Sequence, residues 1–290
     1  MRKKGLHRAT IGDYVISAIL IGLAVCVLMP FINAVVISFV SETEYVRNRL
    51  TFFPKEPTLS AYRKIIAQGW LDIGYKNSLV IVLLGWAYVL CITVLTSYVM
   101  TCRFPGKRLF LAYLVIPMFF SGGLIPMYLQ IRDLNLMDTF GAIVLPAGVS
   151  TYYMLIMSSF FRSIPSSLLE SARLDGASEA RVLWSVILPL SKSILATISL
   201  FVVVAFWNEW FAPMLYIQNP KLLPLQLYLR NVVDASQASA DRGVSAQQVQ
   251  TYAEGVRMAG VMLTMLPIML IYPFLQKYFV RGVMIGAVKG

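Results

Sequence analysis

The chain is poor in the side chains that most enzymes and metal sites require. Its 290 residues include one histidine, His7, and three cysteines, Cys26, Cys91 and Cys102. A single histidine in a basic N-terminal segment cannot supply a zinc site or histidine-based proton transfer. The cysteines lie in or beside apolar segments without a suggestive spacing, so no disulfide is expected. We therefore predict no catalytic residue and no metal ligand.

The sequence also lacks a nucleotide-binding motif. It contains no GxxxxGK(S/T) run and no glycine-rich phosphate loop. The pair Gly122-Gly123, between Pro117 and Pro126, predicts a helix interruption instead. The chain is therefore not expected to hydrolyse ATP, and any energy must come from partners.

Charge is scarce as well. Only 13% of the residues are charged and 58% are hydrophobic, with a mean hydropathy of +0.70, more apolar surface than a soluble domain can bury. Six apolar runs are long enough to cross a bilayer, which takes about 20 helical residues. They are Tyr14–Phe39, Ser78–Met100, Leu109–Ile131, Thr139–Phe161, Ile194–Ile217 and Met258–Phe279. The expected fold is all-α, a polytopic membrane protein with six transmembrane helices in a single domain covering residues 1–290.

The distribution of lysine and arginine predicts the orientation. With the N-terminus inside, the inner segments hold 14 of the 25 cations and 4 of the 14 acids, whereas the remaining 11 cations and 10 acids nearly cancel. Both termini and a loop at about residues 162–192 are then cytoplasmic, and residues 41–76 and 218–257 form outer loops with some helix. The net charge of +11 thus reflects membrane topology, and no nucleic-acid partner is expected.

A polar stretch, residues 166–189, stands between the fourth and fifth apolar runs. Ser167 followed by Glu170 fits a capping box at the start of a helix. Asp175-Gly176 would end that helix, because glycine readily adopts the left-handed closing conformation. Ser178 can cap a second helix, which Pro189 would end or bend. The stretch predicts a docking element made of two amphipathic helices around a glycine corner.

This stretch resembles the EAA motif of ABC importer permeases, and more narrowly that of the maltose-transporter-type permeases for carbohydrates. The matching segments are Glu170-Ser171-Ala172, Asp175-Gly176-Ala177-Ser178 and Ile187-Leu188-Pro189-Leu190, and the likeness extends through Ser163-Ile164-Pro165, Trp207-Asn208-Glu209-Trp210 and Phe279-Val280-Arg281-Gly282-Val283-Met284. Two departures are Ser171 in place of the middle alanine and Ser193 where a proline is usual. Phe52-Phe53-Pro54-Lys55 and the C-terminal residues 282–290 look most like the oligosaccharide and polysaccharide branch.

The resemblance implies a multi-pass permease subunit of an ATP-driven carbohydrate importer in the bacterial inner membrane. Its first polar helix would be the coupling helix, which docks in a cleft of a cytoplasmic ATPase. The implied ATPase-coupling residues are Glu170, Ala172, Asp175, Gly176, Ala177 and Pro189. The implied partners are a second homologous permease, two ATPase subunits that bind ATP and Mg, and an extracytoplasmic solute-binding protein. This chain itself would bind no cofactor.

Glu209 is a carboxylate in the outer part of the fifth apolar run. A charge there is costly, so it is expected to be paired, turned inward or functional. With Trp207 and Asn208 it could line a substrate path, because flat indole faces stack on sugars; alternatively, Glu209 and Asn208 tie the helix to its neighbours. Tyr152 and Tyr153 are further path candidates, although a stripe of tyrosine and methionine at helical spacing, as in this run, is more often a packing surface.

Three other functions compete with carbohydrate import. An ABC permease for another solute, such as an amino acid or phosphate, would share the coupling stretch. A secondary transporter would need midplane acids or half-helices for ions, for which Glu209 alone gives little support. A membrane-embedded enzyme would need more titratable side chains than this sequence places in its apolar runs.

Overall fold

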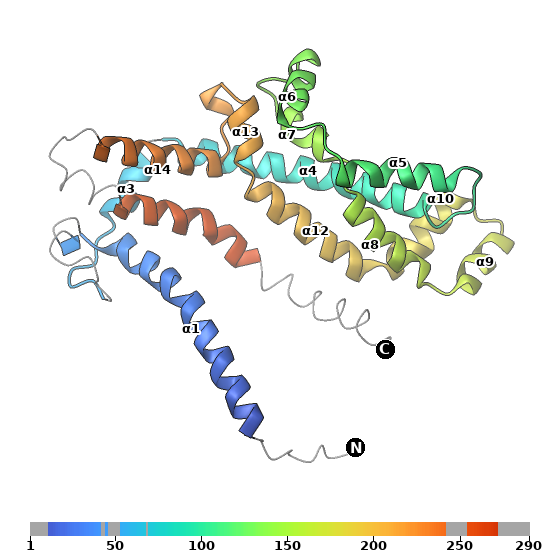
Figure 1. Cartoon of the computed structure of the whole chain (residues 1–290), viewed down its shortest axis with the longest axis horizontal. Helices are drawn as coiled ribbons and strands as arrows, with labels where there is room; N and C mark the ends of the chain where they lie inside the picture. Colours follow the sequence, from blue (N-terminus) through green and yellow to red (C-terminus); the bar gives the residue numbers. More distant parts are fainter. Residues whose placement is uncertain (1–10, 42–43, 46–52, 68, 242–253, 272–290) are drawn as a thin grey trace. The chain divides into compact units, whose positions relative to one another are not determined.

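The computed structural model describes residues 11–41, 44–45, 53–67, 69–241 and 254–271 (Figure 1). Every regular element within these ranges is a helix, and the predicted all-α membrane fold is confirmed. The chain divides into two compact units, Met1–Gln68 with Val232–Leu263, and Gly69–Asn231 with Thr264–Gly290. Each unit is described by itself, and the single permease domain over residues 1–290 stays a prediction.

The first unit contains the first predicted span and the short helix expected in the following outer loop. Helix α1 is Ile11–Phe39 and α3 is Ser60–Ala67. Thr58 N donates to Phe39 O at 2.8 Å, and the hydroxyls of Ser38 and Tyr62 lie 2.8 Å apart. These bonds hold α3 against the end of α1.

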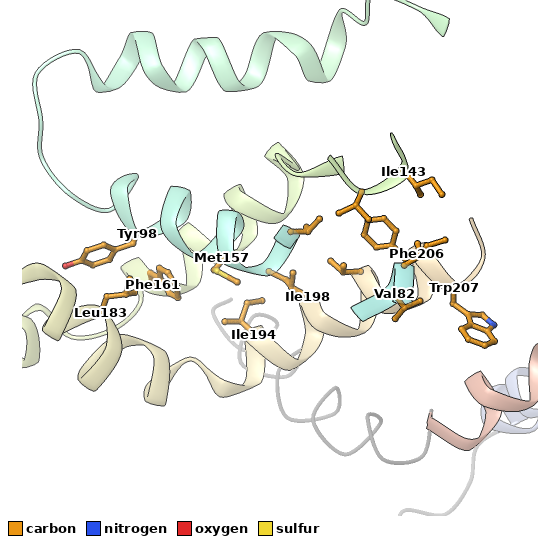
Figure 2. Packing of buried hydrophobic residues seen from close by; sticks show 14 of the residues in the cluster. Val82, Tyr98, Ile143, Met157, Phe161, Leu183, Ile194, Ile198, Phe206 and Trp207 are labelled. Atoms are coloured by element: carbon orange, nitrogen blue, oxygen red, sulfur yellow. The ribbon is translucent and has the colours of Figure 1, made fainter. Parts of the chain in front are cut away.

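The second unit is built on α4, Leu71–Val99, which packs against α8, Thr151–Arg162, and α12, Lys192–Trp207. Their buried apolar side chains form one continuous core (Figure 2). Gly85 of α4 faces the ring of Phe206 on α12, and a Cβ added there would lie 2.4 Å from Cε2 of that ring. A larger residue at this position would therefore force the Phe206 ring to move.

Among the described residues, three helices are long and apolar enough to cross a membrane unbroken: α1, α4 and the helix Glu254–Ile271. Three pairs of helices in the same ranges pass this test together but are bent at a short break. Helices α5 (Lys107–Phe119) and α6 (Leu124–Asp133) are bent by 113°. The segment Gly141–Ala147, made of α7 (Gly141–Val144) and η1 (Leu145–Ala147), is bent by 48° against α8, and Glu179–Leu190 by 83° against α12. Counting each pair as one crossing gives up to six spans, the predicted number, although the third pair begins at Glu179, inside the predicted cytoplasmic loop, and not at the predicted Ile194. The α5–α6 break falls at the predicted interruption, where Gly123 has φ +89°.

The fifth and sixth apolar runs differ in detail from a single straight helix. Within Ile194–Ile217, α12 ends at Trp207 and α13, Phe211–Tyr216, begins after a break. The sixth helix starts at Glu254, before the predicted Met258, and its predicted end at Phe279 lies outside the described residues, as does the similar tail segment Phe279–Met284.

The segment after α13 is fastened to α4 by side chains at the start of that helix. It consists of η3, Pro220–Leu222, and α14, Leu225–Asp241, so the predicted loop at 218–257 is partly helical. Asn77 Nδ2 donates to Lys221 O at 2.9 Å and Leu223 O at 3.1 Å, and Ser78 Oγ accepts from Leu225 N at 2.9 Å. The first turns of α4 thus replace hydrogen bonds that this irregular segment cannot make within itself.

Replacing Gly85 by alanine should destabilise the protein, because the new Cβ meets the buried ring of Phe206. Overpacking of this kind costs about 1–3 kcal/mol. We expect a lower melting midpoint of the detergent-solubilised chain for Gly85→Ala. Gly22→Ala is the matched control, since Gly22 also lies in a spanning helix but has nothing within 4 Å of the added atom. Equal midpoints for both variants would contradict this packing.

Candidate functional site

The predicted coupling helix is α9, Ser166–Leu174, and it ends at the predicted glycine corner. Gly176 has φ +80°, its N–H donates to Arg173 O at 3.0 Å, and Ala177 N donates to Ala172 O at 3.0 Å. This pair of bonds is a Schellman motif, which satisfies carbonyl groups that the end of a helix leaves without partners. Backbone bonds therefore determine the corner.

The predicted start of α9 was wrong by two residues, since Ser167 was expected to be the N-cap. The helix begins at Ser166 with Pro165 as its N-cap, and no side chain caps it, so Ser167 and Glu170 do not form a capping box. Pro165 explains the shift, because its fixed φ suits the entry to a helix and it has no N–H to satisfy. Glu170 is exposed and free of a capping role at this end.

Ser178 caps the second helix as predicted, with its Oγ 3.4 Å from Arg181 N. The helix runs as α10, Glu179–Val182, a π segment η2, Leu183–Ile187, and α11, Leu188–Leu190. Pro189 lacks an N–H and crowds the carbonyl of the preceding turn, and the wider π turn accommodates it. Pro189 therefore neither ends nor sharply bends the helix; the 83° bend comes after Leu190, before α12.

One side of α9 packs inward and the other is open. Leu169, Ala172 and Ala177 are partly buried against the main core. Leu168 and Leu174, by contrast, are 46% and 88% exposed. Small residues on the inner side allow close approach to the core, while two leucines outside are the kind of surface that a partner protein covers.

An ion pair and a hydrogen bond join α9, α10 and α4. Arg173, near the end of α9, binds Glu179 at the start of α10, with Nε–Oε1 at 2.9 Å and Nη2–Oε2 at 3.1 Å. The hydroxyl of Tyr98, in the last turn of α4, donates to Glu179 Oε2. Hydrogen bonds from Arg173 and Tyr98 lower the pKa of Glu179, so this carboxylate, in the polar stretch, is ionised at neutral pH. Sequence analysis missed the contact because Tyr98 and Glu179 are distant in the chain.

Glu209 lies in the break between α12 and α13. Its Oε1 accepts from Phe211 N and from Ala212 N, both at 2.9 Å. A carboxylate in this position satisfies two amide groups that the start of α13 leaves without helical partners. This role is structural, although the partners of Glu209 lie in the adjoining turn and not in a neighbouring span, and its place on a substrate path stays a prediction.

Asn208 and Trp207 face different surroundings. Trp207 is 4% exposed and its Nε1 donates to Thr264 O at 3.0 Å, so its ring is a packing element. Asn208 is exposed; its Nδ2 donates to Val204 O at 3.0 Å and its Oδ1 lies 3.5 Å from Gln226 Nε2. Only Asn208 of these two can offer polar atoms to a solute.

The structure adds Trp210 and Arg230 to this region. The guanidinium carbon of Arg230 lies 3.8 Å from the centroid of the Trp210 ring, in cation–π geometry. Arg230 is on α14 and one turn after Gln226, so both residues reach the 208–210 break from the same helix. Nothing in the sequence links Arg230 to Trp210, since the contact depends on how α14 folds back.

Tyr152 and Tyr153 lie at the start of α8. Tyr152 is 53% exposed, whereas Tyr153 is half-buried and stacks on Phe201 of α12, with centroids 6.3 Å apart. Within the described part of the chain, no hydrogen bond or ring contact joins either tyrosine to residues 207–210. The structure therefore does not bring the predicted path residues into one cluster. No group of metal ligands occurs among the described residues either.

Bent spanning helices and an exposed helix that ends at a glycine corner are features expected of a membrane-embedded transport subunit. The chain belongs to the family of binding-protein-dependent transport system inner membrane components, whose profile matches residues 13–285. It is thus an integral inner-membrane permease and not an enzyme, and the predicted ABC importer permease is confirmed.

Relatives of known name cover nearly the whole chain. Protein LplC of Bacillus subtilis (strain 168) is 37% identical over 93% of this chain and 92% of its own length. The polygalacturonan/rhamnogalacturonan transport system permease protein YtcP of the same strain is 33% identical over 96% and 98%. A crystal structure of a bacterial ABC transporter involved in the import of the acidic polysaccharide alginate has a similar chain, with a TM-score of 0.83, 29% identity and coverage of 94% and 99%.

Removing the Glu209 carboxylate should loosen the α12–α13 break. We expect Glu209→Ala to lower the melting midpoint, because losing a cap costs about 1 kcal/mol. Glu209→Gln keeps an Oε1 acceptor and should fall between Ala and the wild type. Asn208→Ala, at the adjacent exposed position, is the control and should melt normally. A Glu209→Ala protein as stable as Asn208→Ala would argue against the capping role.

Proposed function

We propose that this chain is a permease subunit of an ATP-driven importer for oligosaccharides or polysaccharides. The observation that carries the proposal is the end-to-end similarity to YtcP, named for polygalacturonan and rhamnogalacturonan, and to a chain of an alginate importer. The arabinooligosaccharides permease AraQ of Halalkalibacterium halodurans is also similar, 26% identical over 92% of this chain and 93% of its own length. These names share long sugar chains as the transported class.

We further propose that α9 is the coupling helix, docking on one of two ATPase subunits that bind ATP and Mg. The open side of α9, with Glu170, Leu174 and Asp175, would meet the ATPase. Ala172, Gly176 and Ala177 would set the direction of α9 through the corner, and Pro189 would shape the helix that follows. The absence of a nucleotide motif from the sequence supports separate ATPases.

The complete importer would also contain a second homologous permease and an extracytoplasmic solute-binding protein. The proposed orientation puts both termini and the α9 region in the cytoplasm, supported by the excess of cations in those segments. Both termini lie outside the described residues. Labelling a single cysteine at Ser178 with an impermeant reagent from outside the cell would contradict this orientation.

Transport would follow alternating access. ATP binding closes the ATPase pair, α9 moves with the subunit on which it is docked, and the spans shift from inward-facing to outward-facing. ATP can drive this change because it binds the two states of the dimer with different affinity. On the path itself, exposed Asn208 and Tyr152 are the candidates for sugar contact, while Trp207, Glu209 and Tyr153 would shape its walls.

The substrate class can be tested with the assembled importer in proteoliposomes. Binding proteins loaded with an oligogalacturonide or another oligosaccharide should stimulate ATP hydrolysis and uptake. Binding proteins loaded with an amino acid or with phosphate serve as comparisons and should not. Stimulation by a non-sugar solute alone would replace the carbohydrate assignment, and uptake driven by an ion gradient without ATP would indicate a secondary transporter.

Gly176→Val should uncouple transport from ATP hydrolysis. Valine resists φ +80°, so the corner must rearrange, although nothing within 4 Å blocks the side chain. Gly106→Val is the matched control: Gly106 has φ +78°, is equally unobstructed and lies before α5. We expect similar membrane abundance for both variants and at least about tenfold lower uptake per ATP for Gly176→Val alone. Equal uptake in both variants would refute the role of the corner.

A further inference from the structure

The contact between Tyr98, Glu179 and Arg173 joins the coupling region to the central helix. Arg173 belongs to α9, Glu179 is the first residue of α10, and Tyr98 lies in the last turn of α4. We call these three residues the clamp. Both oxygens of Glu179 bind Arg173, and Oε2 also accepts from Tyr98, so one carboxylate connects the three helices.

Tyr98 is the member of the clamp that is anchored in the core. It is 8% exposed and belongs to the same apolar cluster as Phe161 and Leu183. Figure 2 shows its ring beside these residues, with the hydroxyl directed away from the buried side chains. Burial limits the motion of the ring within the core, so a displacement of Glu179 that moves the Tyr98 hydroxyl would also move α4.

The covalent route from α9 to α12 is less regular than the route through the clamp. It passes through the π segment η2, Pro189 and the 83° bend. At that bend Ser191 is fully buried, and its Oγ has no hydrogen-bond partner among the described residues. Interruptions of the i to i−4 ladder are the places where helices bend. Val182, Leu183 and Ile187 still pack in the core, but the chain itself is a compliant link.

We propose that the clamp makes α9 and α4 move as one body during transport, and that Tyr98 is a positioning residue for coupling. This inference rests on the proposed function, in which α9 docks on the ATPase. A charge-assisted hydrogen bond to a carboxylate is short and directional, so the Tyr98–Glu179 contact keeps α10 in register with α4. A displaced α9 then carries α4 with it, without requiring α12 to transmit the force.

Because α4 is long, a motion applied at Tyr98 would also move the residues that contact its other end. With 29 residues, α4 is about 43 Å long at the helical rise, enough to span the hydrocarbon core. At the end opposite Tyr98, Asn77 and Ser78 hold the backbone of residues 221–225. Gln226 and Arg230, which reach the 208–210 break, follow directly on α14. The clamp therefore links the ATPase side to the break on the other side through one rigid helix.

The test uses the assembled importer in proteoliposomes, with substrate taken up per ATP hydrolysed as the readout. Tyr98→Phe removes one hydroxyl and leaves the buried ring in place. We expect unchanged complex yield and basal ATP hydrolysis, with uptake per ATP lower by about fivefold, the lower end of coupling between sites. Tyr88→Phe is the matched control, since Tyr88 is on the same helix and its hydroxyl makes no hydrogen bond within the described residues. It should behave as the wild type.

Variants at Glu179 separate the clamp from a general structural effect. Its side chain is 56% exposed, so Glu179→Ala should assemble normally. We expect Glu179→Ala to lower uptake per ATP as far as Tyr98→Phe, the double variant to lower it no further, and Glu179→Gln to retain most of it by keeping an acceptor. Additive losses, or a wild-type ratio in Tyr98→Phe, would overturn the clamp. If the wild type itself shows no ATP-dependent uptake, the proposed function fails instead.

Discussion

The hydrocarbon core of a bilayer offers no hydrogen bonds to a peptide group, and this constraint explains how several breaks in the described apolar segments are built. Each break in a spanning segment must supply its own partners. At the α12–α13 break, Glu209 binds two backbone N–H groups, and before α8 the Ser150 hydroxyl lies 3.4 Å from Tyr153 N. Asn77 does the same for residues 221 and 223. These polar residues lie in apolar segments because they form hydrogen bonds with backbone groups that have no helical partner.

The same constraint separates what the sequence predicts from what it leaves open. Apolar length alone indicated six spans, and Gly122-Gly123 between two prolines indicated a break, because both signals are local. The 113° and 83° bends depend on how the resulting segments pack, which periodicity does not encode. The polar corner was predictable for the same local reason: Gly176 and Ser178 act within four residues of themselves.

The roles of the candidate site residues were harder to predict from the sequence than the fold. The cost of a charge in lipid singled out Glu209, yet could not distinguish a capping carboxylate from a sugar ligand. Trp207 was chosen for its flat ring, but burial against Thr264 decides its role, and burial is a property of the assembled helices. Arg230 and Tyr98 were missed because their partners are 20 and 81 residues away in the chain.

The corner at Gly176 has an evolutionary consequence. Its two closing bonds run from main chain to main chain, between residues 172 and 177 and between residues 173 and 176. Side chains on the open side of α9, such as Leu168 and Leu174, take no part in them. If α9 docks on an ATPase as proposed, residues at these outward positions can change to fit that partner without disturbing the angle at which the helix is presented. The direction of α9 is thus determined by main-chain bonds, and the chemistry of its exposed surface by side chains that take no part in them.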